Sequence, residues 1–459
     1  MSSAAHLVPP AVGTRGRVSG RFPAAFARRF FLLLLIGLVW MGPGWSDSRY
    51  LLAMLVWDVG LVLAWWWDFA GLPKPEQLEI RRVWTSPLQL LVETKVTLEV
   101  QNRGTCFIAA EILDDVPLQL RTDVPKMNIT IPAGGKTVAE YSVCPRERGD
   151  ATLGTVSFRY QSGLHLAERW ASAAMKQTVR IYPNLEESKR DTIYLIRSRQ
   201  VALEKRLAHQ RGQGREFESL REYRESDELR DVCWTASARR GKLISKSYQI
   251  ERSQTVWLVL DTGRLLRARV LGLSKLDYAI AAALSVAQVA LHSGDRVAML
   301  AYGRRIQQRL TPGRGSSQLR ALLEGLAQVH GEELEADHRR AVETLAVFQK
   351  RRSLVLWLTD LSETATTPDV VENASHLARR HLVLFTVIGQ PELRDLLEAR
   401  PETPHQMYRY AAAQEIVHRR DVLLRTLRQH GALTLEVEPA RLSSAAVNQY
   451  LLAKERSLI

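Results

Sequence analysis

The chain has 459 residues, 46% of them hydrophobic and 24% charged, and this length and balance predict two or three globular domains with sizeable cores. Lysine and arginine outnumber aspartate and glutamate by 63 to 49, so the formal net charge of +14 favours acidic partners such as nucleic acid, anionic lipid or an acidic protein surface. The three cysteines are too widely separated for a zinc site or a disulfide framework, which indicates a reducing compartment.

Two apolar segments near the N-terminus predict a hairpin that crosses a lipid bilayer. Phe30 to Trp45 carries no charge, and Tyr50 to Trp67 carries only Asp58. We expect residues 1–29 to form a basic cytoplasmic tail and residues 30–67 to form two transmembrane helices. By the positive-inside rule both termini are cytoplasmic, which predicts a multi-pass protein of the inner (cytoplasmic) membrane. The arginines behind this orientation are Arg15, Arg17, Arg21, Arg28 and Arg29 before the hairpin and Arg81 and Arg82 after it.

A cleaved signal is the alternative interpretation of the first apolar segment, because Arg28 to Leu32 (RRFFL) resembles a twin-arginine export motif. No small-residue cleavage site follows it, and the second apolar segment begins within a few residues, as a hairpin requires. Asp58 lies near the middle of the second segment, where an ionised carboxylate costs about 2.5–3.5 kcal/mol. We expect Asp58 to form a helix–helix or oligomer contact rather than a proton relay.

Residues 74–184 predict an immunoglobulin-like β-sandwich. Runs such as KVTLEVQNRG (95–104) and ATLGTVSFRY (151–160) alternate polar and apolar residues, and turn-forming residues separate the runs. The string PAGGKT (132–137) ends like a phosphate-binding loop, but it lacks the earlier glycine and has strands on both sides, so it predicts a hairpin turn. Acids, histidines and nucleophiles do not cluster within residues 74–184, which favours a binding or spacer module over an enzyme for this domain.

Residues 185–252 predict a linker helix followed by a charged signature segment. Between 186 and 211, apolar residues recur at helical intervals among charged ones, which is typical of an amphipathic helix. From 212 to 243, acids and bases alternate densely, and this pattern fits either a solvated helix or a clamp between two domains. Trp234 is followed by small residues, so we expect it to pack against another surface.

A dense set of residues in this segment matches a known signature: Gly212, Gly214, Glu216, Phe217, Leu220, Arg221, Tyr223, Asp227, Arg230, Trp234, Ala238 and Arg239. The segment resembles the family catalogued as domain of unknown function 58 (DUF 58). The resemblance implies two membrane helices, a β-sandwich, the signature and a von Willebrand factor A-like domain. It also implies a partner, because the family is associated with AAA+ ATPases of the MoxR group, thought to assist the assembly or maturation of complexes. Many members carry an aspartate where this chain has Cys233, which we expect to be a small packed residue.

Residues 253–459 predict a doubly wound, Rossmann-type α/β domain. Near-continuous apolar runs such as TVWLVLD (255–261) and SLVLWLTD (353–360) are typical of parallel strands covered on both faces, and helical stretches lie between them. The fold class is therefore α/β plus all-β. Ligands bind such sheets where the strands' carboxyl ends point, and Asp261 and Asp360 each end a strand. We expect both carboxylates to reach that edge.

The resemblance implies a Mg²⁺ site at this edge, built from Asp-any-Ser-any-Ser, a later threonine and a later aspartate. Here Asp261 is followed by Thr-Gly-Arg-Leu, so both serines are missing, and Ser316 and Ser317 are the candidate substitutes for the threonine. Arg264 can neutralise the carboxylates without an ion. We therefore expect a degenerate site and a metal-free protein-binding surface, with weak Mg²⁺ binding at Asp261 and Asp360 as the alternative.

Two functions remain open at this point. The first is a non-enzymatic, membrane-anchored adaptor or scaffold for a cytoplasmic partner, with a MoxR-type AAA+ ATPase implied by the resemblance. The second is a metal-dependent hydrolase or a metal-bridged adhesion domain that uses Asp261 and Asp360. The sequence lacks a Walker lysine motif, a nucleophile elbow and a zinc helix, and it has no base-stacking motif, so we expect neither a cofactor nor nucleic-acid binding.

Overall fold

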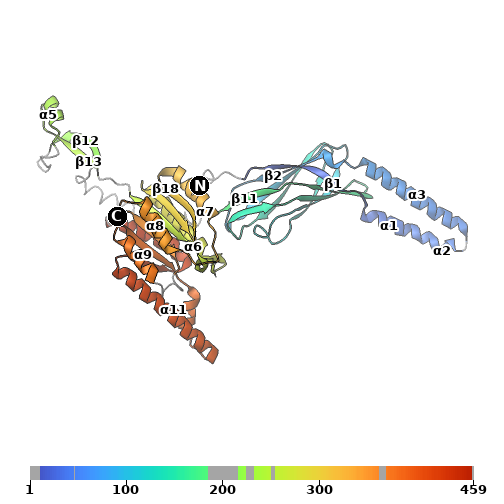
Figure 1. Ribbon diagram of the computed structural model, residues 1–459. Helices are drawn as coiled ribbons and strands as arrows, with labels where there is room; N and C mark the ends of the chain where they lie inside the picture. Colours follow the sequence, from blue (N-terminus) through green and yellow to red (C-terminus); the bar gives the residue numbers. More distant parts are fainter. Residues whose placement is uncertain are drawn as a thin grey trace. The chain divides into compact units, whose positions relative to one another are not determined.

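A computed structural model describes residues 11–45, 47–184, 216–223, 232–249, 254–360 and 368–456. The chain is a mixed α/β protein that divides into two compact units, Met1–Tyr182 and Pro183–Ile459 (Figure 1). The linker helix predicted between 186 and 211 lies outside the described residues.

The first unit is built mainly from antiparallel strands. An eight-stranded sheet has the order β6-β5-β9-β10-β1-β2-β4-β7, and a three-stranded sheet has the order β3-β11-β8. Burial alternates along the strands, for example in Thr94–Asn102, so one face of each strand enters a common apolar core. The strands are β1 Thr14–Phe26, β2 Leu78–Trp84, β3 Leu88–Gln89, β4 Thr94–Asn102, β5 Ile108–Asp114, β6 Lys126–Ile131, β7 Lys136–Val143, β8 Gly149–Leu153, β9 Val156–Gln161, β10 Ala167–Ala173 and β11 Gln177–Tyr182.

Strand β1 corrects the prediction of a basic tail over residues 1–29. Its backbone pairs with β10 on one side and β2 on the other, so this segment belongs to the sheet. Arg15 and Arg17 are exposed, whereas Gly16 and Val18, which alternate with them, are buried. A Cβ atom on Gly16 would lie 2.5 Å from Met175 Cγ, so the inward position requires glycine. Arg15 and Arg17 are therefore outward residues of a strand whose inward residues include Gly16 and Val18.

The string PAGGKT forms a turn, but the predicted β-hairpin is wrong, because β6 pairs with β5 and β7 pairs with β4 rather than with each other. It joins β6 to β7, and Gly134 has a φ of +64°, which glycine adopts without strain. The turn is not followed by a helix, so the backbone amides are not gathered at a helix N-terminus as in a phosphate-binding loop.

A helical hairpin is inserted between β1 and β2. It comprises α1 Arg28–Gly37, the 3₁₀ turn η1 Leu38–Trp40, α2 Met41–Gly44 and α3 Ser48–Gly71. Trp57 Nε1 donates a hydrogen bond to the Leu33 carbonyl at 3.0 Å, and the tryptophan ring lies against Gly37, so small and polar groups close the hairpin.

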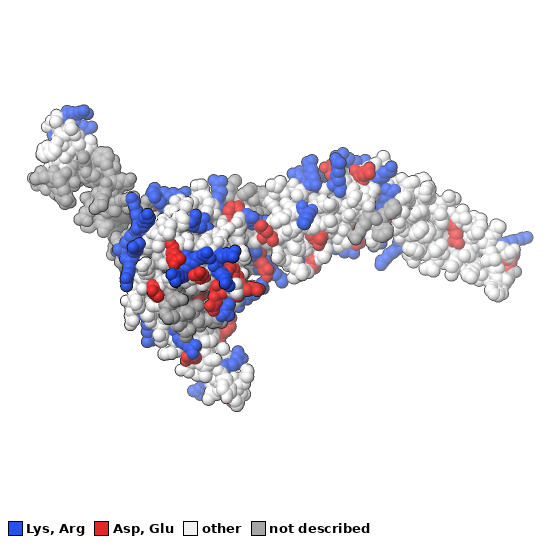
Figure 2. Space-filling view, viewed as in Figure 1, with Lys and Arg blue, Asp and Glu red and all other residues white. Residues whose placement is uncertain are grey.

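The outer surface of the hairpin is apolar and exposed. Figure 2 shows this part of the molecule almost free of charged side chains. By length and composition, one helical stretch among the described residues, Ser48–Gln77, can cross a membrane. The exposed apolar side chains include Leu32, Leu35, Leu52, Leu55, Val59 and Leu63.

A buried carboxylate joins the hairpin to the sheet. Asp68, near the end of α3, is 4% exposed and accepts hydrogen bonds from the backbone amides of Leu166 at 3.0 Å and Ala167 at 2.9 Å. Trp65 Nε1 donates to the Ala25 carbonyl at 3.4 Å, beside the end of β1. Charged acceptors make stronger hydrogen bonds than neutral ones. The base of the hairpin is therefore fixed to the start of β10 and the end of β1.

The second unit is centred on a six-stranded sheet with the order β18-β17-β14-β19-β20-β21. All neighbouring strands are parallel except β18, which is antiparallel to β17. The strands predicted from apolar runs are present, and the polar edge strand β18 is an addition. Their bounds are β14 Thr255–Asp261, β17 Arg296–Tyr302, β18 Ile306–Gly313, β19 Leu354–Thr359, β20 Leu382–Ile388 and β21 Leu433–Val437; a short ribbon pairs β15 Arg269–Val270 with β16 Leu273–Ser274.

Helices cover both faces of this sheet, as the strand pattern predicted. Helices α6 (Lys275–His292), α7 (Gly315–Gln328) and α12 (Leu442–Glu455) pack together on one face. On the other face, α8 (His338–Phe348), α9 (Pro368–Ala378) and α11 (Pro404–Gln429) enclose an apolar cluster with Trp257, Trp357 and Phe385 of the strands. Helix α10 (Pro391–Glu398) contacts α11.

Candidate functional site

The two aspartates predicted to share a sheet edge lie at the ends of neighbouring strands. Asp261 is the last residue of β14 and Asp360 directly follows β19, and these strands are paired with Leu260 opposite Leu358. Asp261 is 4% exposed and Asp360 is 1% exposed. A carboxylate this deeply buried requires hydrogen bonds or opposite charges in place of water. The partners of each aspartate therefore decide what this edge can bind.

Asp261 is held by neutral hydrogen-bond donors. Thr359 Oγ1 donates to its Oδ2 at 2.6 Å, and the Gly263 amide donates to its Oδ1 at 2.7 Å. Burial raises the pKa of Asp261, because the charged form loses its hydration, and the charge of His338 and these two hydrogen bonds only partly oppose the rise. Each carboxylate oxygen of Asp261 therefore accepts one hydrogen bond from the protein itself.

Asp360 is held by two cations. Lys275 Nζ donates to its Oδ2, and Arg420 Nη2 lies 3.5 Å from its Oδ1. The Lys275 side chain is completely buried and that of Arg420 is 3% exposed, so bulk water does not screen these pairs. Arg420 Nη1 also pairs with Glu436 Oε1 of β21 at 3.0 Å.

These contacts do not fit a bound Mg²⁺ ion. An octahedral magnesium ion needs six oxygen ligands, and it repels nearby ammonium and guanidinium groups. At this edge, Asp261 already accepts two hydrogen bonds and Asp360 already faces two cations. In the described part of the chain, no group of three or more histidine, cysteine, aspartate or glutamate residues is arranged to hold a metal ion.

Two details of the predicted site are wrong. Ser316 and Ser317 lie in the first turn of α7, and the pairing of Gly313 with Val297 puts that turn beside the start of β17, at the opposite edge from Asp261. Arg264 is 44% exposed and forms an ion pair with Glu335 at 3.0 Å. The buried cations at Asp360 are Lys275 and Arg420 instead.

Sequence reasoning missed three residues of the site. Thr359 directly precedes Asp360, so its proximity to Asp261 follows once β14 and β19 are known to be neighbours. Lys275 lies 85 residues before Asp360. Arg420 lies 60 residues after it. A lysine at the start of an otherwise apolar helix was the available signal, because a cation is unfavourable at a helix N-terminus without a partner.

The signature segment is described only in part. Strand β12 (Glu216–Glu222) pairs with β13 (Ile244–Gln249), and the short helix α5 (Trp234–Arg240) lies between them in sequence. Glu216, Phe217, Leu220 and Arg221 belong to β12, with Tyr223 directly after it, and Ala238 and Arg239 belong to α5. Gly212, Gly214, Asp227 and Arg230 lie outside the described residues.

Trp234 does not pack as the sequence predicted. Its side chain is 67% exposed, at the first position of α5, while the preceding Cys233 is half-buried with Sγ 3.6 Å from Thr235 Oγ1. Leu220 and Leu243 are also exposed, by 38% and 47%. Exposed tryptophans are enriched among the residues that dominate binding energy at protein interfaces. Exposed basic residues of the same segment are Arg239, Arg240 and Lys242.

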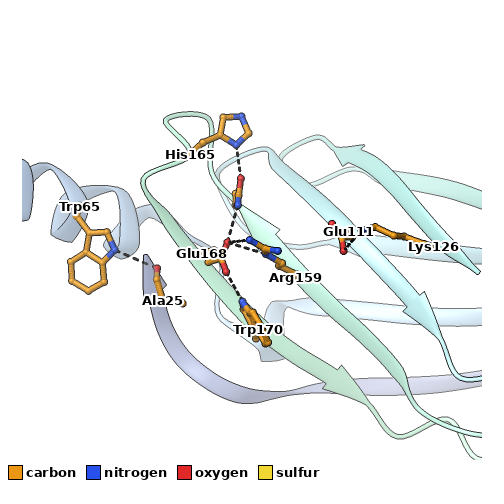
Figure 3. A network of polar contacts seen from close by, with 9 residues as sticks. Ala25, Trp65, Glu111, Lys126, Arg159, His165, Glu168 and Trp170 are labelled. Carbon is orange, nitrogen blue, oxygen red and sulfur yellow. Dashed lines mark hydrogen bonds and ion pairs between the residues drawn. The ribbon is translucent and has the colours of Figure 1, made fainter. Parts of the chain in front are cut away.

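A second buried carboxylate, Glu168, lies in the β-rich unit (Figure 3). It is 3% exposed and accepts hydrogen bonds from Arg159 Nη2 at 2.8 Å, Gln161 Nε2 at 2.9 Å and Trp170 Nε1 at 2.6 Å. Burial alone would raise the pKa of Glu168, but the hydrogen bonds from Arg159, Trp170 and Gln161 outweigh it and hold the pKa below its usual value. His165 Nδ1 extends the network to Gln161 Oε1 at 2.8 Å.

The lowered pKa of Glu168 predicts acid sensitivity of the β-rich unit. The ionised form is favoured by folding, so its contribution is present above the ordinary pKa near 4.5 and is lost as pH falls through the lower folded pKa. In urea unfolding followed between pH 7 and pH 3, the wild type will lose stability on acidification more steeply than Glu168→Gln. Equal slopes for the two proteins would contradict this prediction.

Comparison with known proteins gives one family and several distant structures. A family described as "Protein of unknown function DUF58" matches residues 219–397. The matched segment begins within β12 and ends in α10. No curated protein matches the chain. The crystal structure of the conserved hypothetical protein BatB from Bacteroides thetaiotaomicron is similar over 44% of this chain and 100% of that chain, with 15% identity and a TM-score of 0.31. An aerotolerance-related membrane protein from Bacteroides fragilis is similar over 43% and 98%, with 15% identity and a TM-score of 0.29. Neither similarity supports a functional assignment at such low TM-scores.

Proposed function

We propose that this protein is a membrane-anchored, non-enzymatic adaptor that presents its second unit, a von Willebrand A-like domain with the DUF 58 signature, to a cytoplasmic partner. The partner we propose is a MoxR-type AAA+ ATPase that acts in the assembly or maturation of complexes. The observation that carries the proposal is an exposed apolar hairpin fixed to a folded unit, together with a signature segment whose tryptophan is exposed.

The hairpin supports an anchor that enters and leaves the bilayer on the same side. Strand β1 leads into α1 and α3 leads out towards β2, and β1 and β2 pair with each other. Helix α3 has 24 residues and spans about 36 Å, enough for a hydrocarbon core of about 30 Å. By the positive-inside rule, the arginines at 28, 29 and 81 support a cytoplasmic location for that side, as proposed for an inner-membrane protein with two spans.

The signature segment supports protein recognition. Tryptophan and arginine are the residues most enriched among those that dominate binding energy at protein interfaces, and Trp234 is exposed with Arg239 and Arg240 on the same short helix. The charge of this helix fits an acidic surface on the partner. The sheet edge supports a binding function rather than metal-dependent catalysis. Asp261 accepts a hydrogen bond from Thr359 and Asp360 accepts one from Lys275, so these carboxylates are engaged by the protein's own donors.

Binding of a purified MoxR-type ATPase from the same organism to the full-length protein in lipid nanodiscs tests the proposal. Trp234→Ala will weaken this binding by about 30-fold or more, because truncating a central aromatic residue costs about 2 kcal/mol or more. Tyr408→Ala is the matched control, since Tyr408 is an aromatic residue of the second unit that is 79% exposed but lies outside the signature.

Two outcomes would refute the adaptor. In the first, the ATPase does not bind the wild type in nanodiscs. In the second, the two variants bind equally well. Turnover of a phosphoester or peptide substrate that requires Mg²⁺ and is lost in Asp261→Ala would instead favour the hydrolase, the competing function for this edge.

A further inference from the structure

The burial of Lys275 is the starting observation, and it is independent of the adaptor role. Lys275 is the first residue of α6, after a capping box formed by Ser274 and Asp277, and its side chain has no exposed surface. A buried ammonium group loses most of its hydration, and at a helix N-terminus it also faces the positive end of the helix dipole. Such a position is stable only if a carboxylate compensates for both effects. Asp360 is that carboxylate.

Asp360 connects helices from opposite faces of the sheet. Through Lys275 it holds the start of α6, which covers one face. Through Arg420 it holds α11, which packs on the other face, and Arg420 also reaches Glu436 on β21. In a metal site of this fold, a divalent ion would connect the strand-end loops by coordination. Here the same connection is made by an ammonium and a guanidinium group.

The positive and negative charges around Asp360 already balance, so a further cation is not needed to neutralise them. Lys275 and Arg420 contribute two positive charges, and Asp360 and Glu436 contribute two negative ones. Asp261 adds a carboxyl group that is hydrogen-bonded to Thr359 and Gly263. A divalent ion would have to displace these donors and approach two fixed cations, which is strongly unfavourable at low dielectric.

We infer that Lys275 is a permanent internal cation that takes the place of a divalent metal ion at this sheet edge, so that the edge keeps one conformation whether or not metal is present.

The test follows the thermal unfolding of the second unit in the full-length protein, solubilised in detergent, by differential scanning calorimetry. The Tm of the wild type will not change with millimolar Mg²⁺, Mn²⁺ or EDTA. Lys275→Ala will lower the Tm by roughly 6–12 °C, because it leaves a buried carboxylate short of a cation. Ethylammonium or Mn²⁺ at millimolar concentration will restore part of that loss by entering the space vacated beside Asp360.

Lys454→Ala is the matched control. Lys454 forms an ion pair with the buried Asp295 at 2.8 Å in the same unit, and Tyr450 donates a hydrogen bond to the same carboxylate. Removal of the Lys454 side chain will also lower the Tm. Mn²⁺ will not restore this Tm, because Asp295 lacks a second carboxyl group such as the one that Asp261 supplies beside Asp360. Restoration of both variants alike would show a non-specific effect of the ion and overturn the inference.

Three further outcomes overturn the inference. The first is a rise in the wild-type Tm with Mg²⁺ that disappears in Asp360→Asn. The second is a Lys275→Ala protein with an unchanged Tm. If Lys275→Ala does not fold, Lys275→Met combined with Asp360→Asn gives the answer, since removing both charges will recover stability if the two groups compensate each other. The third outcome that overturns the inference is a double variant, Lys275→Met with Asp360→Asn, that folds no better than Lys275→Met alone. None of these results depends on whether an ATPase binds.

Discussion

Asp114→Ala will destabilise the β-rich unit by about 3–5 kcal/mol, because it leaves a buried guanidinium group without its counter-charge. Arg82 and Asp114 are both fully buried, and Arg82 Nε lies 3.1 Å from Asp114 Oδ2. Tyr141 donates a hydrogen bond to the same carboxylate at 2.7 Å, and burial and the charge of Asp114 raise the pKa of Tyr141. Urea unfolding of the full-length protein in detergent, monitored for this unit, measures the loss.

Asp123→Ala is the control for this prediction. Asp123 also pairs with an arginine of the β-rich unit, Arg121 at 2.9 Å, but its side chain is 67% exposed. Exposed ion pairs contribute about 0–1 kcal/mol, so this variant will stay close to the wild type. If Asp114→Ala costs no more than Asp123→Ala, the buried pair does not hold the unit together. Asp114→Ala also shows which transition in the calorimetry of the full-length protein belongs to the β-rich unit, because only that transition will shift.

Leu55→Arg combined with Val59→Arg will release the protein from membranes. Both residues lie in the middle of α3 and are exposed, by 64% and 52%. Each arginine at the centre of a transmembrane helix costs about 2.5–3.5 kcal/mol on insertion scales, so the pair costs about 5–7 kcal/mol. The measurement is the fraction of full-length protein that floats with carbonate-washed membranes in a density gradient.

Leu118→Arg combined with Val124→Arg controls for added charge alone. These residues are 76% and 55% exposed and lie in the loop between β5 and β6, whereas the hairpin enters between β1 and β2. The control variant will float like the wild type. A wild-type protein that stays in solution without detergent, or a Leu55 and Val59 double variant that still floats, would show that the hairpin is not the anchor.

The fold could be predicted where each segment carries its own pattern. Strand β14 lies where a run of apolar residues ends in Asp261, and the turn at Gly134 follows from turn residues between alternating runs. The pairing of the two strands beside that turn was predicted wrongly, since β6 and β7 pair with other strands. Strand β1 was missed because glycine occupies inward positions such as Gly16, so the apolar half of the alternation is weak. Strand β18 was missed because an edge strand has few buried side chains to reveal it.

The candidate site could be predicted only in its local part. Asp261 and Asp360 were found because parallel strands end at a shared edge. Lys275 and Arg420 were not found, because the contact of each with Asp360 depends on how helices pack over the sheet, and no local pattern encodes that packing. The sequence correctly indicated that the serine ligands are missing but named Arg264 as the neutralising cation.

The contacts of Asp68 have a mechanical consequence for the membrane anchor proposed above. The carboxylate is clasped by two consecutive backbone amides at the start of β10, and the chain passes from β1 into α1 with no intervening loop of its own. A swivel at this point would have to strip a buried charge of its donors. Tilting of the hairpin in response to bilayer thickness would therefore rotate the β-rich unit with it as one rigid body.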